Sequence, residues 1–115
     1  MKYREAYIQR ISDWLSVQPG QIELYWKGRV GLYALLQAFG VKAGDEVILP
    51  AFTCVVVPNA IIYCGAKPIY VDISPKTLNT TLTHIKETIT EKTKVIMVQN
   101  TFGLSNEVDE ISAYA

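Results

Sequence analysis

The sequence predicts an α/β fold in which helices alternate with mostly parallel strands. Apolar runs at 46–49, 68–72 and 93–99, rich in β-branched residues, are typical of strands buried in a parallel sheet. Segments with the 3.6-residue apolar spacing of helices separate these runs. Because the two kinds of segment alternate at short intervals, we expect helices on the faces of the sheet. The length of 115 residues suits one domain or a piece of one.

Two helices are expected before the first strand. Residues 3–17 form the first, and the turn residues at 18–21 end it. Two interpretations stay open for residues 22–26, a short strand or an extended lead-in. The second helix opens at Gly28, and Gly40 is placed just past its end. The apolar stripe of this helix consists of Leu32, Leu35, Leu36 and Phe39.

The third helix has two possible starts. Thr53 is a residue type that caps helices, and the helix would then contain Pro58 in its interior. Because proline kinks a helix interior, the regular helix begins instead near Pro58 in the second interpretation. Gly65 ends the helix in both cases. Thr81 is a good N-cap for the next helix, at 82–89.

The last helix suggests that the chain is part of something larger. We expect it to start at Ser105 or Asn106, with Val108 and Ile111 on one apolar face. That face has no later element to meet, and three parallel strands are thin for a sheet covered on both faces. We therefore expect residues 1–115 to be a single domain that forms the front portion of a larger, truncated one.

The charge balance disfavours several kinds of partner. Lys plus Arg and Asp plus Glu number 11 each, so neither nucleic acid nor a membrane surface is an expected partner. No signal peptide precedes the chain, which predicts a cytoplasmic location. Cys54, Cys64 and His84 fit no metal-binding spacing, and a structural disulfide is not expected. We interpret Cys64 as a core residue and His84 as a surface residue.

Ligands of parallel α/β sheets bind outside the carboxyl ends of the strands. In this chain those ends lie at Pro50–Thr53, Asp72–Ser74 and Asn100–Gly103. Asp72 itself is assigned to structure, since a carboxylate at a strand end can cap the next turn.

Ordered motifs identify a family. Between about Gly28 and Asp109 the chain carries GDEVILP, a TC turn, NAI, GAKP, VD and finally NTFG. No single motif is specific, but the ordered set resembles the N-terminal part of the DegT/StrS sugar aminotransferases. The resemblance implies a partial large domain of the fold type I aminotransferase fold, with pyridoxal 5'-phosphate as cofactor. It also implies a homodimer, with glutamate as the usual amino donor and a nucleotide-linked keto sugar as substrate.

The resemblance also implies site residues. The cofactor phosphate is held by backbone N–H groups at a helix N-terminus, here Gly28, Arg29 and Val30. Relatives often carry Ser or Thr at this turn, where this chain has Lys27 and Arg29. We interpret Lys27 as pointing to solvent rather than at the phosphate.

Three more residues are expected near the cofactor ring. The position of the family's ring-stacking aromatic is Cys54, which offers less contact area, and Phe52 replaces it only with a different backbone path. Asn59 is expected at the cofactor end of the third helix. Asn100 falls on the substrate side, where relatives often carry His, and its amide can donate a hydrogen bond but cannot titrate.

The resemblance places two catalytic groups beyond Ala115, namely the Asp that pairs with the pyridine nitrogen and the Lys that carries the cofactor. We therefore expect no catalytic residue within the 115 residues, and weak or no cofactor binding by the chain alone. The alternative interpretation is a non-enzymatic family remnant that regulates or binds a partner. The sugar, its nucleotide and the amino donor stay undetermined.

Overall fold

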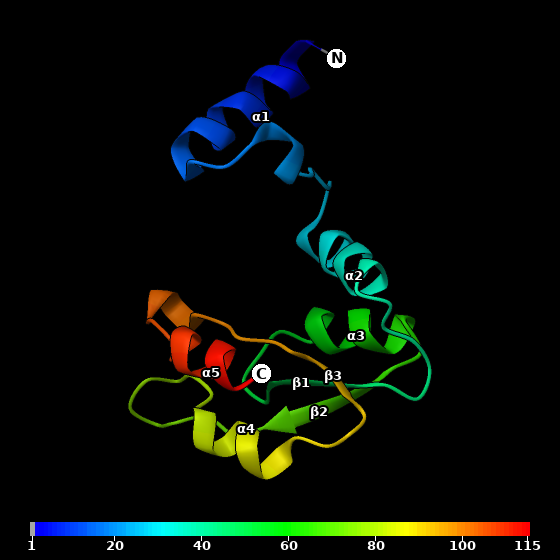
Figure 1. Cartoon of the computed structure of the whole chain (residues 1–115), viewed down its shortest axis with the longest axis vertical. Helices are drawn as coiled ribbons and strands as arrows, with labels where there is room; N and C mark the ends of the chain where they lie inside the picture. Colours follow the sequence, from blue (N-terminus) through cyan, green and yellow to red (C-terminus); the bar gives the residue numbers. More distant parts are fainter. Residues whose placement is uncertain (1) are drawn as a thin grey trace.

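A computed structural model, which describes residues 2–115, has the expected α/β architecture (Figure 1). Strands β1 (Glu46–Pro50), β2 (Lys67–Val71) and β3 (Thr93–Ile96) form one parallel sheet in the order β2-β1-β3. The helices are α1 (Lys2–Leu15), η1 (Pro19–Gln21), α2 (Gly28–Ala38), α3 (Val56–Tyr63), α4 (Leu82–Thr88), η2 (Thr101–Gly103) and α5 (Val108–Tyr114). The prediction of a parallel sheet is confirmed.

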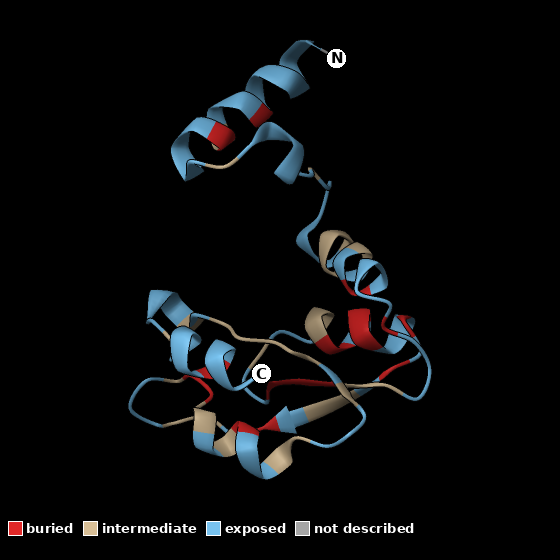
Figure 2. Ribbon diagram, in the orientation of Figure 1, coloured by how far each residue is buried: buried red, intermediate tan, exposed pale blue. Residues whose placement is uncertain are grey.

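The central strand β1 is buried on both faces. Side chains of a strand alternate between the two faces, and all of Val47, Ile48 and Leu49 are inaccessible to solvent. Val47 and Leu49 pack under α2 and α3, whereas Ile48 packs with Ile85 of α4 and Ile111 of α5. Helices therefore cover both faces of the sheet (Figures 1 and 2), although it has three strands.

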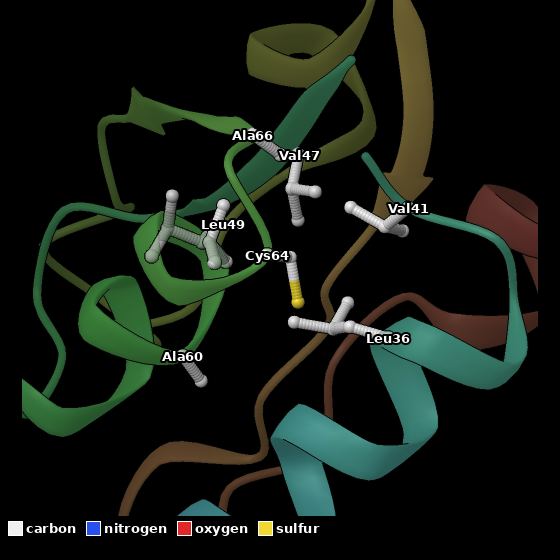
Figure 3. Close-up of a cluster of buried hydrophobic side chains, with 8 residues drawn as sticks. Leu36, Val41, Val47, Leu49, Ala60, Cys64 and Ala66 are labelled. Atoms are coloured by element: carbon white, nitrogen blue, oxygen red, sulfur yellow. The ribbon is translucent and has the colours of Figure 1, made fainter. Parts of the chain in front are cut away.

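One of the two cores joins α2 and α3 to the sheet. Leu36 of α2 is 1% exposed, and the Cys64 sulfur points toward it (Figure 3). The prediction that Cys64 is a core residue is thus confirmed. Leu35, expected in the same stripe as Leu36, is 52% exposed.

Glycines end the helices on both sides of β1. Gly40 has φ +72°, and the N–H of Val41 donates to the Leu36 carbonyl at 3.1 Å. Gly65 has φ +80°, and the N–H of Ala66 donates to the Ile61 carbonyl at 3.3 Å. Both ends are Schellman motifs, so the two glycines have the expected role.

The start of α3 agrees with the second interpretation, a helix that begins near Pro58. The helix begins at Val56, after Val55 as N-cap, and Thr53 does not cap it. Pro58 is the third residue of the helix, where its missing N–H has no helical partner to lose.

The end of β3 departs from the predicted strand, whereas residues 22–26 agree with one of their two interpretations. The third strand was predicted to reach Gln99, but β3 ends at Ile96, and one further N–H, that of Met97, donates to the Ile48 carbonyl at 2.8 Å. Residues 22–26 contain no strand, which agrees with the extended lead-in.

Four expectations concern the C-terminal part of the chain. Thr81 caps α4, since its Oγ1 accepts the N–H of His84 at 3.4 Å. Neither Ser105 nor Asn106 starts α5, which begins at Val108 after Glu107 as N-cap. The apolar face of α5 does meet a partner, because Ile111 is 3% exposed and packs on elements earlier in the chain.

His84 is half-buried, so its assignment to the surface was wrong.

Helix α1 stands apart from the sheet and its other helices (Figure 1). The radius of gyration is 15.6 Å, whereas a compact chain of this length has about 13 Å. Among the apolar residues of α1, Ile8 is buried but Trp14 is 83% exposed. Most of α1 is accordingly exposed in Figure 2.

Neighbouring leucines of α2 test which face stabilises the fold. We expect Leu36→Ala to lower the free energy of unfolding by about 2–5 kcal/mol, because it removes a fully buried side chain from the core. Leu35→Ala is the matched control, and it should cost less than about 1 kcal/mol since half its side chain is in water. Urea denaturation followed by circular dichroism measures both, and equal losses would contradict this assignment of the buried face.

Candidate functional site

The topology creates a crevice between β1 and β3. The chain leaves β1 toward α3 on one face and leaves β3 toward α5 on the other. Where the exits of neighbouring parallel strands diverge in this way, their carboxyl ends form a ligand-binding crevice. A pocket of about 420 Å³, here called the strand-end pocket, occupies that place. It is lined by Phe52, Thr53, Cys54, Gln99, Asn100, Thr101 and Phe102.

Two aromatic rings face each other in this lining. The ring centroids of Phe52 and Phe102 are 6.1 Å apart, and the ring planes are tilted by 57°. Phe102 has φ +53°, in the left-handed region that residues with a side chain seldom adopt. The two rings are 49% and 78% exposed, so they offer apolar area to a flat ligand.

Polar groups of the exit loop after β1 complete the pocket. The Thr53 hydroxyl oxygen is shielded from water and has no hydrogen-bond partner within the described part of the chain. Buried hydroxyl groups almost always have a partner, so this one is an exception that costs free energy in the folded chain. Cys54 beside it is a free and exposed thiol.

The opposite wall is oriented by hydrogen bonds within the chain. The side-chain oxygen of Asn100 accepts the backbone N–H of Asn106 at 3.0 Å, which fixes the direction of the Asn100 amide. The backbone N–H of Thr101 donates to the Asn79 side chain at 3.1 Å. This wall is therefore held in place without a ligand.

The N-terminus of α2 is free to bind an anion. Its N-cap, Lys27, makes no capping hydrogen bond through its side chain. A Cβ added to Gly28 would meet no atom within 4 Å, so the packing of the chain does not itself require glycine there. Open space beside an uncapped helix N-terminus suits close approach of a phosphate. The Lys27 Nζ lies 4.6 Å from the centroid of the Trp26 ring, where a cation is attracted to the ring.

The sequence-predicted site residues divide between two hollows. Cys54 and Asn100 line the strand-end pocket, as predicted for residues at strand ends. Arg29, Val30 and Asn59 line a separate groove of about 440 Å³ between α2 and α3, together with Tyr33 and Tyr63. Gly28 is not among the lining residues of either hollow.

Two lining residues, and one residue that supports the pocket wall without lining it, were not singled out from the sequence. Phe102 and Thr101 lie in the NTFG motif, whose Gly103 indicates a turn but not the left-handed conformation of Phe102. Asparagine is an ordinary residue type in turns. Nothing in the sequence indicates that Asn79 forms a hydrogen bond with a segment more than twenty residues later.

Two further observations bear on the kind of site. Within residues 2–115, no group of three His, Cys, Asp or Glu side chains is arranged to hold a metal ion. The helices of the same residues include none that is long and apolar enough to cross a membrane.

The fold and the strand-end pocket define a class of protein, an α/β domain with a cofactor-type crevice at the carboxyl edge of its sheet. Residues 27–115 match the DegT/DnrJ/EryC1/StrS aminotransferase family. The chain belongs to this family, which confirms the resemblance inferred from its motifs.

One relative is dTDP-4-dehydro-2,3,6-trideoxy-D-glucose 4-aminotransferase of Saccharopolyspora spinosa. It is 34% identical over 100 residues, which cover 87% of this chain and 26% of the relative. The chain thus spans about a quarter of the length of this curated relative.

Solved structures of aminotransferases also match this chain. The aminotransferase TlmJ of Streptoalloteichus hindustanus matches with a TM-score of 0.76 and 33% identity, over 80% of this chain and 25% of that one. NtdA of Bacillus subtilis, solved with bound cofactor PMP, matches with a TM-score of 0.73 and 36% identity, over 76% of this chain and 20% of that one. The fold is that of part of a fold type I aminotransferase, as predicted.

The unpartnered Thr53 hydroxyl gives a test of the pocket. We expect Thr53→Val to leave the free energy of unfolding unchanged or to raise it by up to about 1 kcal/mol, because it removes a shielded polar group that lacks a partner.

The matched control is Thr81→Val, the same chemical change at the α4 cap, which should cost about 1 kcal/mol. Thermal and urea melts measure both variants. A larger loss for Thr53→Val than for Thr81→Val would mean that the Thr53 hydroxyl already has a partner.

Proposed function

We propose that this chain is the cofactor-facing front portion of the large domain of an aminotransferase. The enzyme depends on pyridoxal 5'-phosphate and acts on a nucleotide-linked keto sugar, with glutamate as the amino donor. The observation that carries the proposal is the strand-end pocket, whose paired rings offer apolar area to a flat ligand. Family membership and the substrate in the relative's name support it.

The residues present fit the cofactor in two places. Two phenyl rings and the Cys54 thiol offer apolar contact to a pyridine ring. The uncapped N-terminus of α2 is free for the phosphate. The exit of β1 and the start of α2 belong to the same edge of the sheet, because α2 ends next to the amino end of β1.

The proposal gives each site residue a role in binding. Backbone N–H groups at Gly28 and Arg29 hold the phosphate, and Val30 and Asn59 shape the adjoining groove. Cys54 and Phe52 pack against the ring, while Asn100 faces the sugar and donates a hydrogen bond to it. When bound, the cofactor supplies the electron sink that lets a proton leave the carbon next to the transferred nitrogen.

The catalytic lysine is assigned to residues outside this chain. The residues that line the strand-end pocket, all within the described range, include no lysine. We therefore propose that the 115 residues bind the cofactor weakly and reversibly, and we expect no transamination. We further propose a cytoplasmic homodimer, since the family resemblance implies an active site built by two subunits.

A chimera tests the function directly. The matching segment of the Saccharopolyspora spinosa aminotransferase is replaced by residues 28–109 of this chain, and amino transfer to dTDP-4-dehydro-2,3,6-trideoxy-D-glucose is assayed. We expect measurable turnover with pyridoxal phosphate bound. A chimera that folds but takes up no cofactor would overturn the proposal.

Cofactor contact at Cys54 can be strengthened by substitution. Cys54→Trp introduces a large ring at an exposed position of the pocket, and we expect about 2- to 10-fold tighter binding, as for a favourable aromatic pair. The probe is pyridoxamine 5'-phosphate, whose fluorescence reports binding and which has no aldehyde to react with surface lysines. Cys54→Ser is the control and should bind no more tightly than the wild type. Unchanged affinity in Cys54→Trp would place the ring elsewhere.

A non-enzymatic, partner-binding role is the second candidate, and exposed aromatic residues of α1 favour it. Tyr3, Tyr7 and Trp14 are 91%, 58% and 83% exposed. In this case the chain melts cooperatively by itself and pyridoxamine 5'-phosphate does not bind. Binding of that probe at micromolar concentration would exclude this candidate.

A further inference from the structure

The loop that walls the strand-end pocket has an unfavourable backbone conformation. Phe102 and Gly103 both have positive φ, at +53° and +80°. Only the second is a glycine, so the Phe102 conformation is strained and must be held by its surroundings. The conformation has a consequence for the pocket, since Phe102 lies against Phe52 of the opposite wall.

A buried asparagine, Asn79, holds this loop through hydrogen bonds of its side chain. Asn79 is 2% exposed, and its side-chain N–H groups donate to the carbonyl oxygens of Leu104 at 2.9 Å and Ser105 at 3.0 Å. Its side-chain oxygen accepts the backbone N–H of Thr101 at 3.1 Å. The two donors and the acceptor of one amide are thus used on both ends of the Phe102 turn.

Asn79 is itself fixed by its own loop. Its carbonyl oxygen accepts the N–H of Ser74 at 2.9 Å, and its N–H donates to the Thr77 hydroxyl at 3.4 Å. This loop follows β2, whereas the Phe102 turn follows β3. Because β2 and β3 lie on opposite sides of β1, the asparagine connects the exit loops of the two outer strands.

A second asparagine supports the same turn. Asn106 donates its backbone N–H to the Asn100 side chain at 3.0 Å and its side-chain N–H to the Gln99 carbonyl at 3.3 Å. These bonds close the base of the loop but leave the N–H of Thr101 to Asn79. Within the turn, the Gly103 N–H donates to the Asn100 carbonyl and the Leu104 N–H to the Thr101 carbonyl, each at 3.1 Å. Asn79 adds the bonds that reach the turn from another loop, at Thr101 and at Leu104.

We propose that Asn79 is a positioning residue for the strand-end pocket. It fixes the Thr101–Leu104 turn, sets Phe102 against Phe52, and so gives the pocket its shape, although it is not among the residues that line it. The identity of the ligand, a pyridoxal 5'-phosphate-type cofactor, rests on the proposed function. The role of Asn79 in shaping the wall does not.

The test compares Asn79→Ala with Thr80→Val. Thr80 is the next residue, is also 2% exposed, and has a shielded hydroxyl without a partner among the described residues. Its loss therefore breaks no hydrogen bond. Two quantities are measured on the 115-residue chain at low temperature, namely amide hydrogen exchange by NMR and affinity for pyridoxamine 5'-phosphate.

In Asn79→Ala we expect the Thr101 amide to exchange at least about tenfold faster, while the Met97 amide, bonded to the core strand, keeps its rate. Pyridoxamine 5'-phosphate should bind about tenfold more weakly. Thr80→Val should match the wild type in both quantities. Equal acceleration at Thr101 and Met97, or unchanged exchange and affinity in a folded variant, would overturn the proposal.

If Asn79→Ala does not fold, amide hydrogen exchange in the wild type tests the proposal. The Thr101 amide should exchange well below the rate of an unprotected amide although its loop is at the surface, and exchange at the unprotected rate would overturn the proposal. A separate outcome concerns the function. A wild type that binds no pyridoxamine 5'-phosphate, with Thr101 still released in Asn79→Ala, would refute the cofactor site and uphold the positioning role.

Discussion

The structure depends on the burial of one strand on both of its faces. Val47, Ile48 and Leu49 alternate across β1, and each is inaccessible to solvent. A strand of this kind needs apolar cover on two sides, and α2 and α3 supply one cover while α4 and α5 supply the other. The helices must therefore leave the sheet in both directions. The sheet consequently holds together with three strands, and the last helix finds its partner in residues that precede it.

The same requirement produces the crevice. Because α3 follows β1 on one face and α5 follows β3 on the other, the two exit loops diverge and leave a pocket between them. Phe52, Thr53 and Cys54 come from one exit, and Asn100 to Phe102 come from the other. The chain supplies aromatic area there through Phe52 and Phe102, whereas the family resemblance places the ring-stacking residue of relatives at the position of Cys54.

Hydrogen bonds decide the shape of the pocket where packing does not. The Phe102 turn is largely exposed and has a conformation that costs free energy, so apolar burial does not hold it. Asn79 and Asn106 satisfy its backbone groups from the buried side instead. In contrast, the side chain of the α2 N-cap makes no capping hydrogen bond, which leaves this helix N-terminus open to an anion. Hydrogen bonds within the chain thus hold one wall of the pocket, and the paired rings offer apolar area to a ligand.

The sequence by itself determined the order of helices and strands, the parallel sheet, the glycine ends at Gly40 and Gly65, the Thr81 cap and the family, because periodicity and turn chemistry are local. It placed Cys54 and Asn100 at strand ends, where they line one pocket. It did not locate the burial of Ile111, the separation of Arg29 and Asn59 into another groove, or the role of Asn79. Those features were decided by tertiary structure, since each depends on contacts between segments far apart in the chain, whose energies no local pattern of residues records.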